Sequence, residues 1–102
     1  MPKITVSCQS SAAPEQTFKK IQERLPIDPD LTKLGGEMTF HFDPHQLSAA
    51  AKGARFNAQM QVRPHTSGSQ VAIQVEIPLV LMPLKTIIHS TLEKKFKEYF
   101  AS

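Results

Sequence analysis

Apolar and polar residues alternate along four stretches of the chain, a pattern typical of β-strands that bury one face. These stretches are Ile4–Cys8, Met38–Phe42, Phe56–Val62 and Val71–Ile77. Asp43-Pro44 follows the second stretch and is a turn signal. The segment Pro64–Ser69, between the last two stretches, predicts a hairpin loop.

Leu47–Ala51 is rich in alanine and alternates only weakly, so helix propensity competes there with the strand pattern. We favour a short strand, because the stretch that follows alternates clearly. The inward-facing positions change from odd to even numbers near Gly53. Such a change requires a turn or a bulge, and glycine suits either.

The first helical pattern lies between the first two strands. Phe18, Ile21 and Leu25 have helical spacing and predict a helix over residues 14–25. Pro26 ends this helix, because proline removes a backbone donor. Two further features, a second proline and a Gly-Gly pair, predict that residues 26–36 form a connecting loop.

The last helix is expected from Pro83 to Phe100. Lys95 interrupts its apolar stripe, and we expect the stem to pack while the amine stays in water. We expect the same of Lys85 at the edge of the stripe: its stem packs and its amine stays in water. A sharper hypothesis is that Lys85 points into a groove between helix and sheet, where it pairs with a ligand carboxylate or phosphate. The apolar stripe comprises Leu84, Ile88, Leu92, Phe96 and Tyr99.

The expected element order is β-α-β-β-β-β-α in one domain spanning residues 1–102. Short connections between strands imply a single antiparallel sheet. Each strand has one polar face, so both helices must cover the same face of the sheet. The sequence therefore predicts an α+β fold with a long C-terminal helix.

The segment that joins the last strand to the last helix is apolar. Pro78 and Pro83 bracket Leu79–Met82 and should make this linker stiff. We expect Leu79, Val80, Leu81 and Met82 to be buried under the first helix. The alternative is an exposed patch that meets a hydrophobic surface or a partner.

Composition and charge exclude only a few classes of function. The net charge of +3 over 102 residues is mild, and acidic residues interleave with the lysines of the last helix, so nucleic-acid binding is not expected. No signal peptide and no transmembrane segment are predicted. Cys8 is the single cysteine, which rules out an internal disulfide, and a bacterial cytoplasm is the expected location.

Few residues are candidates for chemistry. His41, Asp43 and His45 share a strand face by spacing, but Pro44 and the expected turn spoil a metal site. Cys8 has inward parity and is expected to be a buried, inert thiol. We therefore predict no catalytic residues, no metal and no cofactor.

Residues from Leu47 to the end carry a family resemblance. A glycine-containing strand pair, Lys52–Val62, precedes the alternating strand Val71–Ile77, the link Pro83-Leu84-Lys85 and a terminal amphipathic helix. This order resembles the polyhydroxyalkanoic acid system proteins, small bacterial proteins found near polyester-granule genes. It is also similar to small helix-grip (START-like) proteins, in which a long C-terminal helix crosses a curved sheet.

The resemblance implies a non-enzymatic accessory protein that associates with polyhydroxyalkanoate granules or granule proteins. The alternatives are a helix-grip module for a small hydrophobic or acyl ligand, and an interaction or oligomerisation domain. The candidate interaction surface is Leu79–Met82. The candidate ligand-binding residues are Lys85, Leu84, Ile88, Leu92, Phe56 and Met60.

Overall fold

The computed structural model describes residues 3–100, apart from the side chains of Leu34 and Gly35. The predicted domain bounds, 1–102, extend beyond this range at both ends. The fold is α+β, as the sequence predicts. The elements in chain order are β1 (Lys3–Ser10), α1 (Pro14–Arg24), the 3-10 helix η1 (Leu25–Ile27), α2 (Pro29–Gly35), β2 (Met38–Asp43), β3 (Ser48–Gly53), β4 (Asn57–His65), β5 (Gly68–Glu76), the 3-10 helix η2 (Leu79–Leu84) and α3 (Lys85–Phe100).

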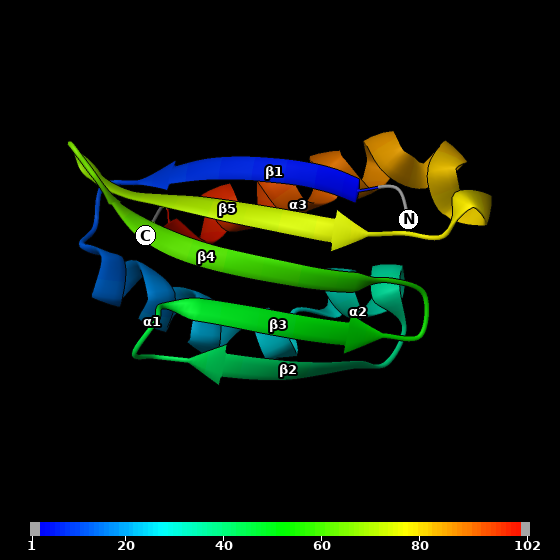
Figure 1. The fold of residues 1–102 in the computed structure, drawn as a ribbon, viewed down its shortest axis with the longest axis horizontal. Helices are drawn as coiled ribbons and strands as arrows, with labels where there is room; N and C mark the ends of the chain where they lie inside the picture. The colour runs from blue at the N-terminus through cyan, green and yellow to red at the C-terminus, as the bar shows by residue number, and fades with distance from the viewer. Residues whose placement is uncertain (1–2, 101–102) are drawn as a thin grey trace.

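Within residues 3–100, the strands form one five-stranded antiparallel sheet in the order β1-β5-β4-β3-β2 (Figure 1). Three successive hairpins build β2 to β5. β1 then pairs with β5, so that Ile4 lies opposite Val75. The helices α1 and α2 carry the chain from the β1 edge of the sheet to the β2 edge.

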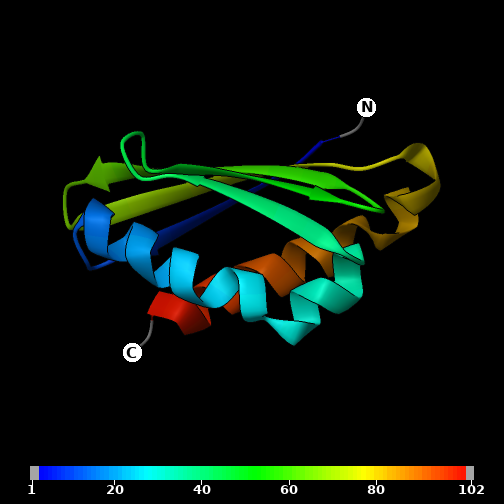
Figure 2. The ribbon, with the colours of Figure 1, turned by 90° about the horizontal axis from the view of Figure 1, so that it is seen from below.

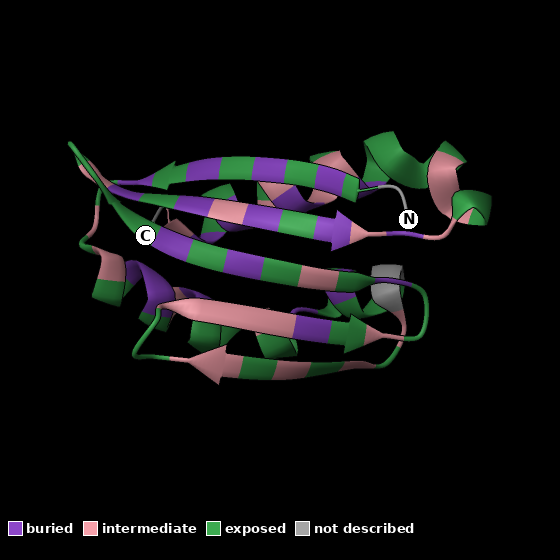
Figure 3. Cartoon of the chain, viewed as in Figure 1, coloured by how far each residue is buried: buried purple, intermediate pink, exposed green. Residues whose placement is uncertain are grey.

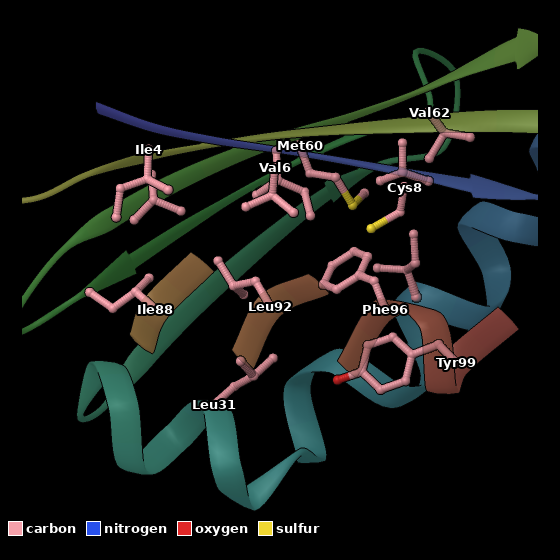
Figure 4. Close-up of a cluster of buried hydrophobic side chains, with 14 of the residues drawn as sticks. Ile4, Val6, Cys8, Leu31, Met60, Val62, Ile88, Leu92, Phe96 and Tyr99 are labelled. Carbon is pink, nitrogen blue, oxygen red and sulfur yellow. The ribbon is translucent and has the colours of Figure 1, made fainter. Parts of the chain in front are cut away.

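The helices lie on one face of the sheet, and the other face is open (Figure 2). Burial alternates residue by residue along β1 and follows the predicted parity (Figure 3). Four residues of α3, Ile88, Leu92, Phe96 and Tyr99, are buried against this covered face (Figure 4). Full burial of such a side chain contributes about 1.5–3 kcal/mol, so this stripe is a main source of stability.

A buried hydroxyl cluster ties α1 to the strand ends. The Thr17 hydroxyl lies 3.0 Å from Ser10 Oγ and 3.2 Å from Ser69 Oγ, and Ser69 Oγ donates to the Ala12 carbonyl at 2.5 Å. Gly68 beside it has a φ of +146°, and a Cβ there would lie 2.1 Å from the Ser10 carbonyl oxygen. Only glycine therefore fits at this position.

The prediction of a loop over residues 26–36 is wrong. η1 and α2 occupy most of this segment. Asp28 caps α2, because its side chain accepts a hydrogen bond from the Asp30 amide, and Pro29 stands in the first turn. Proline is well tolerated at the start of a helix, where its missing donor is not needed. Leu31 then fixes α2 to the core, since its side chain is buried.

The strands differ from expectation mainly at their ends. The alanine-rich segment is a strand, as we favour above, and the switch near Gly53 is a turn, in which the Gly53 amide donates to the Phe56 carbonyl. The predicted six-residue loop Pro64–Ser69 is wrong, because β4 and β5 pair as far as His65 and Gly68. Pro64 fits within β4 because the pairing of β3 with β4 ends at Gln61, which leaves one side of this part of β4 unpaired.

The last helix begins later than predicted. Pro83 lies inside η2, and α3 starts at Lys85. In the part of the chain that the structure describes, none of the helices is long and apolar enough to cross a membrane.

Candidate interaction surface and internal cavity

The segment after β5 exposes aliphatic side chains to solvent. Leu79 is 76% exposed and Val80 is 80% exposed, and on the next turns Leu84 and Ile87 are 42% and 56% exposed. These four residues form what we call the apolar tip. The prediction that Leu79–Met82 are buried under the first helix is therefore wrong for Leu79 and Val80.

The position of η2 explains this exposure. β5 ends at Glu76, and η2 continues past the end of the sheet, whereas α1 lies beneath the opposite end (Figures 1 and 2). Only Leu81 and Met82 turn back, and they pack half-buried against the core. The alternative that the sequence left open, an exposed patch, describes Leu79 and Val80.

Basic residues from three elements lie around the apolar tip. Lys33 of α2 and Arg55 of the β3–β4 turn line a shallow depression of about 190 Å³ together with Leu84 and Ile87. Lys85, the first residue of α3, has an exposed side chain and follows Leu84 directly. Exposed aliphatic side chains are thus flanked by positive charge.

A small cavity lies between the sheet and the helices. Its volume is about 50 Å³, and its lining is almost entirely apolar. Small inward-facing side chains on β3 and β4, Ala49, Ala51 and Ala58, line this space. Typical ligand pockets measure about 300–1,000 Å³, so this cavity is too small for a long acyl chain in its present shape.

Five of the six candidate ligand-binding residues line the internal cavity, the shallow depression near the apolar tip, or both. Phe56, Met60 and Leu92 line the internal cavity. Leu84, Ile88 and again Phe56 line the shallow depression near the apolar tip. The lining of both hollows lacks Lys85, which lies at the surface. Leu84, expected on the inward stripe of the last helix, is partly exposed instead.

A polar cluster holds the other end of α3. The Tyr99 hydroxyl donates to Asp28 Oδ2 at 2.6 Å, within the protein interior. Lys95 Nζ lies 2.5 Å from Asp30 Oδ2 and 3.8 Å from Asp28 Oδ1. We call Asp28, Asp30, Lys95 and Tyr99 the polar anchor, because they fasten α3 to the start of α2.

Burial and the contacts within the polar anchor shift the pKa values of Tyr99, Asp30 and Lys95. Burial and the hydrogen bond to the Asp28 carboxylate raise the pKa of Tyr99 far above its usual range. The hydrogen bond between Asp30 and Lys95 lowers the pKa of Asp30 and raises that of Lys95. The stem of Lys95 therefore packs as expected, with its side chain 17% exposed, and its amine is ion-paired at the surface with Asp30, whose side chain is half-exposed.

Sequence reasoning missed this anchor. Asp28 and Tyr99 are 71 residues apart, and a hydrogen bond over that distance leaves no periodic signal. The local signals were the Asp-Pro pair at Asp28, which marks a helix start, and the single tyrosine among the inward residues of the last helix. A buried tyrosine hydroxyl usually has a partner.

The remaining candidates have structural roles. The Asp43 carboxylate accepts hydrogen bonds from the His45 and Gln46 amides at 3.1 and 3.3 Å, which closes the β2–β3 turn. Cys8 is buried as expected, and burial raises the pKa of its thiol. Among residues 3–100, no three His, Cys, Asp or Glu side chains gather as metal ligands would.

Comparison with known proteins supports the fold. No family model and no curated protein sequence matches the chain. Among solved structures, the chain is similar to TTHA0849 from Thermus thermophilus, with a TM-score of 0.60, 13% identity, and coverage of 96% of this chain and 91% of that one. It is also similar to the protein CV1439 from Chromobacterium violaceum, with a TM-score of 0.56, 12% identity, and coverage of 99% and 96%.

Proposed function

We propose that this protein is a non-enzymatic accessory protein of the bacterial cytoplasm that docks on polyhydroxyalkanoate granules through its apolar tip. The exposure of Leu79 and Val80 at the end of the sheet carries the proposal. The resemblance to polyhydroxyalkanoic acid system proteins supplies the identity of the surface. The long axis of the molecule would then extend away from the granule.

The energetics favour a hydrophobic target. Scattered exposed aliphatic residues are ordinary, but Leu79, Val80, Leu84 and Ile87 fall within nine positions of one another on adjoining elements. Full burial of each side chain contributes about 1.5–3 kcal/mol. Part of this gain is offset by the loss of translational and rotational freedom on binding. We therefore expect reversible adsorption to a hydrophobic surface.

Co-sedimentation with isolated polyhydroxybutyrate granules tests the proposal. The wild-type protein should pellet with the granules, and the double variant Leu79→Ser/Val80→Ser should stay in the supernatant. Ile27→Ser is the matched control, because Ile27 is 78% exposed but lies on η1, apart from the apolar tip. The proposal fails if wild type remains in solution, or if the Ile27 variant loses binding as fully as the tip variant.

A second function, binding of a small hydrophobic ligand, is favoured by the internal cavity. Phe56, Met60 and Leu92 offer an apolar lining, and the volume of about 50 Å³ restricts the ligand to a few heavy atoms unless the helices move. Filling the cavity by Ala51→Val should abolish a thermal shift with short-chain fatty acids. A clean apo mass in native mass spectrometry, with no thermal shift in wild type, argues against this function.

A third function, self-association through the apolar tip, predicts dimers in light scattering. Leu79→Ser/Val80→Ser should then restore the monomer. A wild-type monomer at all concentrations would remove this function and leave granule docking intact.

A further inference from the structure

The basic residues around the apolar tip restrict the kind of surface that the apolar tip can bind. Lys33, Arg55 and Lys85 come from α2, the β3–β4 turn and α3. The fold brings them to the same end of the molecule as the apolar tip, with Lys33 and Arg55 lining the depression beside Leu84 and Ile87. Among the described residues, none of these three cations has a carboxylate within ion-pair distance.

Some basic residues elsewhere in the chain form ion pairs within the protein. Lys95 pairs with Asp30, Lys97 pairs with Glu93, and Lys3 pairs with Glu76. The three cations near the apolar tip form no such ion pair among the described residues, although Lys33 also attracts the Asp30 carboxylate. What sets them apart from other exposed cations such as Lys19 and Lys94 is their position beside exposed aliphatic side chains. An uncharged polyester offers no partner for them.

We infer that the apolar tip docks on a lipid surface with anionic head groups. The inference rests on the proposed granule function and adds that the surface to which the protein adsorbs carries anionic lipid. In this arrangement Leu79 and Val80 enter the acyl boundary, while Lys33, Arg55 and Lys85 lie at the depth of the phosphates. Apolar burial combined with attraction to anionic lipids is the usual basis of interfacial binding.

The composition of the apolar tip favours lipid over a protein partner. Its members are leucine, valine and isoleucine, and leucine and valine are under-represented among protein-interface hot spots, which are rich in tryptophan, tyrosine and arginine. The tip is also a projection beyond the sheet end (Figure 2). A fluid lipid surface adapts to such a projection, whereas a protein partner would need a matching groove.

Vesicle sedimentation tests the inference. Wild type should bind vesicles of equal parts phosphatidylglycerol and phosphatidylcholine, and should bind pure phosphatidylcholine far less. Each basic residue near an anionic surface strengthens binding about fivefold. The triple variant Lys33→Gln/Arg55→Gln/Lys85→Gln should therefore bind the mixed vesicles on the order of a hundredfold more weakly. Its binding to lipid-free polyester particles should be unchanged.

The matched control removes the same charge elsewhere. Lys19, Arg63 and Lys94 are exposed and lie on α1, on β4 and further along α3. Lys94 is about 13 Å along the helix axis from Lys85. Lys19→Gln/Arg63→Gln/Lys94→Gln should retain most of the binding. An equal loss in both triple variants would mean that net charge alone governs binding, and would overturn the inference.

The salt dependence of vesicle binding tests the inference without any substitution. At 1 M ionic strength the Debye length is about 3 Å, so wild-type binding to mixed vesicles should fall to the level seen with phosphatidylcholine. Equal binding to neutral and anionic vesicles at low salt overturns the inference. If lipid-free polyester still binds wild type in that case, granule docking stands. Failure to bind polyester particles, coated or bare, would overturn the proposed function as well.

Discussion

The two ends of α3 are held in different ways. At its C-terminal end, Tyr99 and Lys95 are engaged with Asp28 and Asp30 at the start of α2. At its N-terminal end, η2 is fastened only by the half-buried Leu81 and Met82, and aliphatic neighbours face solvent. The polar groups of the polar anchor form hydrogen bonds and ion pairs with one another, whereas the apolar tip leaves aliphatic side chains exposed to solvent. The C-terminal end of α3 is thus held by polar contacts in addition to the buried stripe, whereas the N-terminal end is next to exposed aliphatic surface.

Asp28→Ala should have the largest effect on folding. The change removes the cap of α2, the acceptor of the Tyr99 hydroxyl and a charge near Lys95. Loss of a helix cap costs about 1 kcal/mol, and an unsatisfied buried hydroxyl costs a further 1–3 kcal/mol. We expect the free energy of unfolding, measured in urea, to fall by about 2–4 kcal/mol.

Asp28→Asn is the control for this prediction. Asparagine keeps one side-chain oxygen, which can cap α2, but replaces the second oxygen with an NH2 donor that cannot accept from Tyr99, so it should restore only the capping part and cost less than alanine. A loss below about 0.5 kcal/mol for Asp28→Ala would show that the anchor adds little, because that is the range of an ordinary surface change.

The Asp30–Lys95 pair should make stability depend on pH. Because the pKa of Asp30 is lowered from 3.8, its contribution is complete above that value and is lost as pH falls through the folded-state pKa. Because the pKa of Lys95 is raised from 10.5, its contribution is complete below that value and is lost as pH rises through the folded-state pKa. At neutral pH, wild type should therefore unfold at a higher urea concentration than Asp30→Asn. The free energy of unfolding that Asp30→Asn loses should be smaller than the loss in Asp28→Ala.

This stability difference between wild type and Asp30→Asn should vanish in strong acid. A double-mutant cycle with Lys95→Met isolates the pair from the titration of other carboxylates. If the difference persists at low pH, the ion pair is not its source.

The apolar tip should show the smallest effect on folding. Leu79→Ser/Val80→Ser removes exposed side chains, so the free energy of unfolding should change by no more than about 0.5 kcal/mol. Differential scanning calorimetry checks this. A large loss of stability would mean that Leu79 and Val80 are buried in solution, which would remove the contrast between the two ends of α3.

The sheet was predictable because burial repeats every second residue. Ile4, Val6 and Cys8, and later Val71, Ile73 and Val75, alternate without interruption and face the helices as expected. The stripe Ile88, Leu92, Phe96 and Tyr99 was predictable for the same reason at helical spacing. Both patterns indicate which face of the sheet and which face of the last helix are covered.

Three features were beyond such patterns. α2 escapes the periodic pattern because a proline within a segment usually marks a loop, whereas here Asp28 before Pro29 makes the pair a helix start. The exposure of Leu79 and Val80 depends on where the sheet ends relative to α1, and hydropathy does not encode that position. The Asp28–Tyr99 bond joins segments whose proximity arises only when the whole fold is formed.

The pairing of β1 with β5 has a consequence for synthesis on the ribosome. Ile4 is made well before its partner Val75, which lies 71 residues further along the chain. The meander of β2 to β5 can form from neighbouring hairpins, whereas β1 must wait for a partner far along the chain. Once β5 has joined the meander, and until β1 pairs with it, β5 has one unpaired edge along Val71, Ile73 and Val75, which another copy of the chain can pair with.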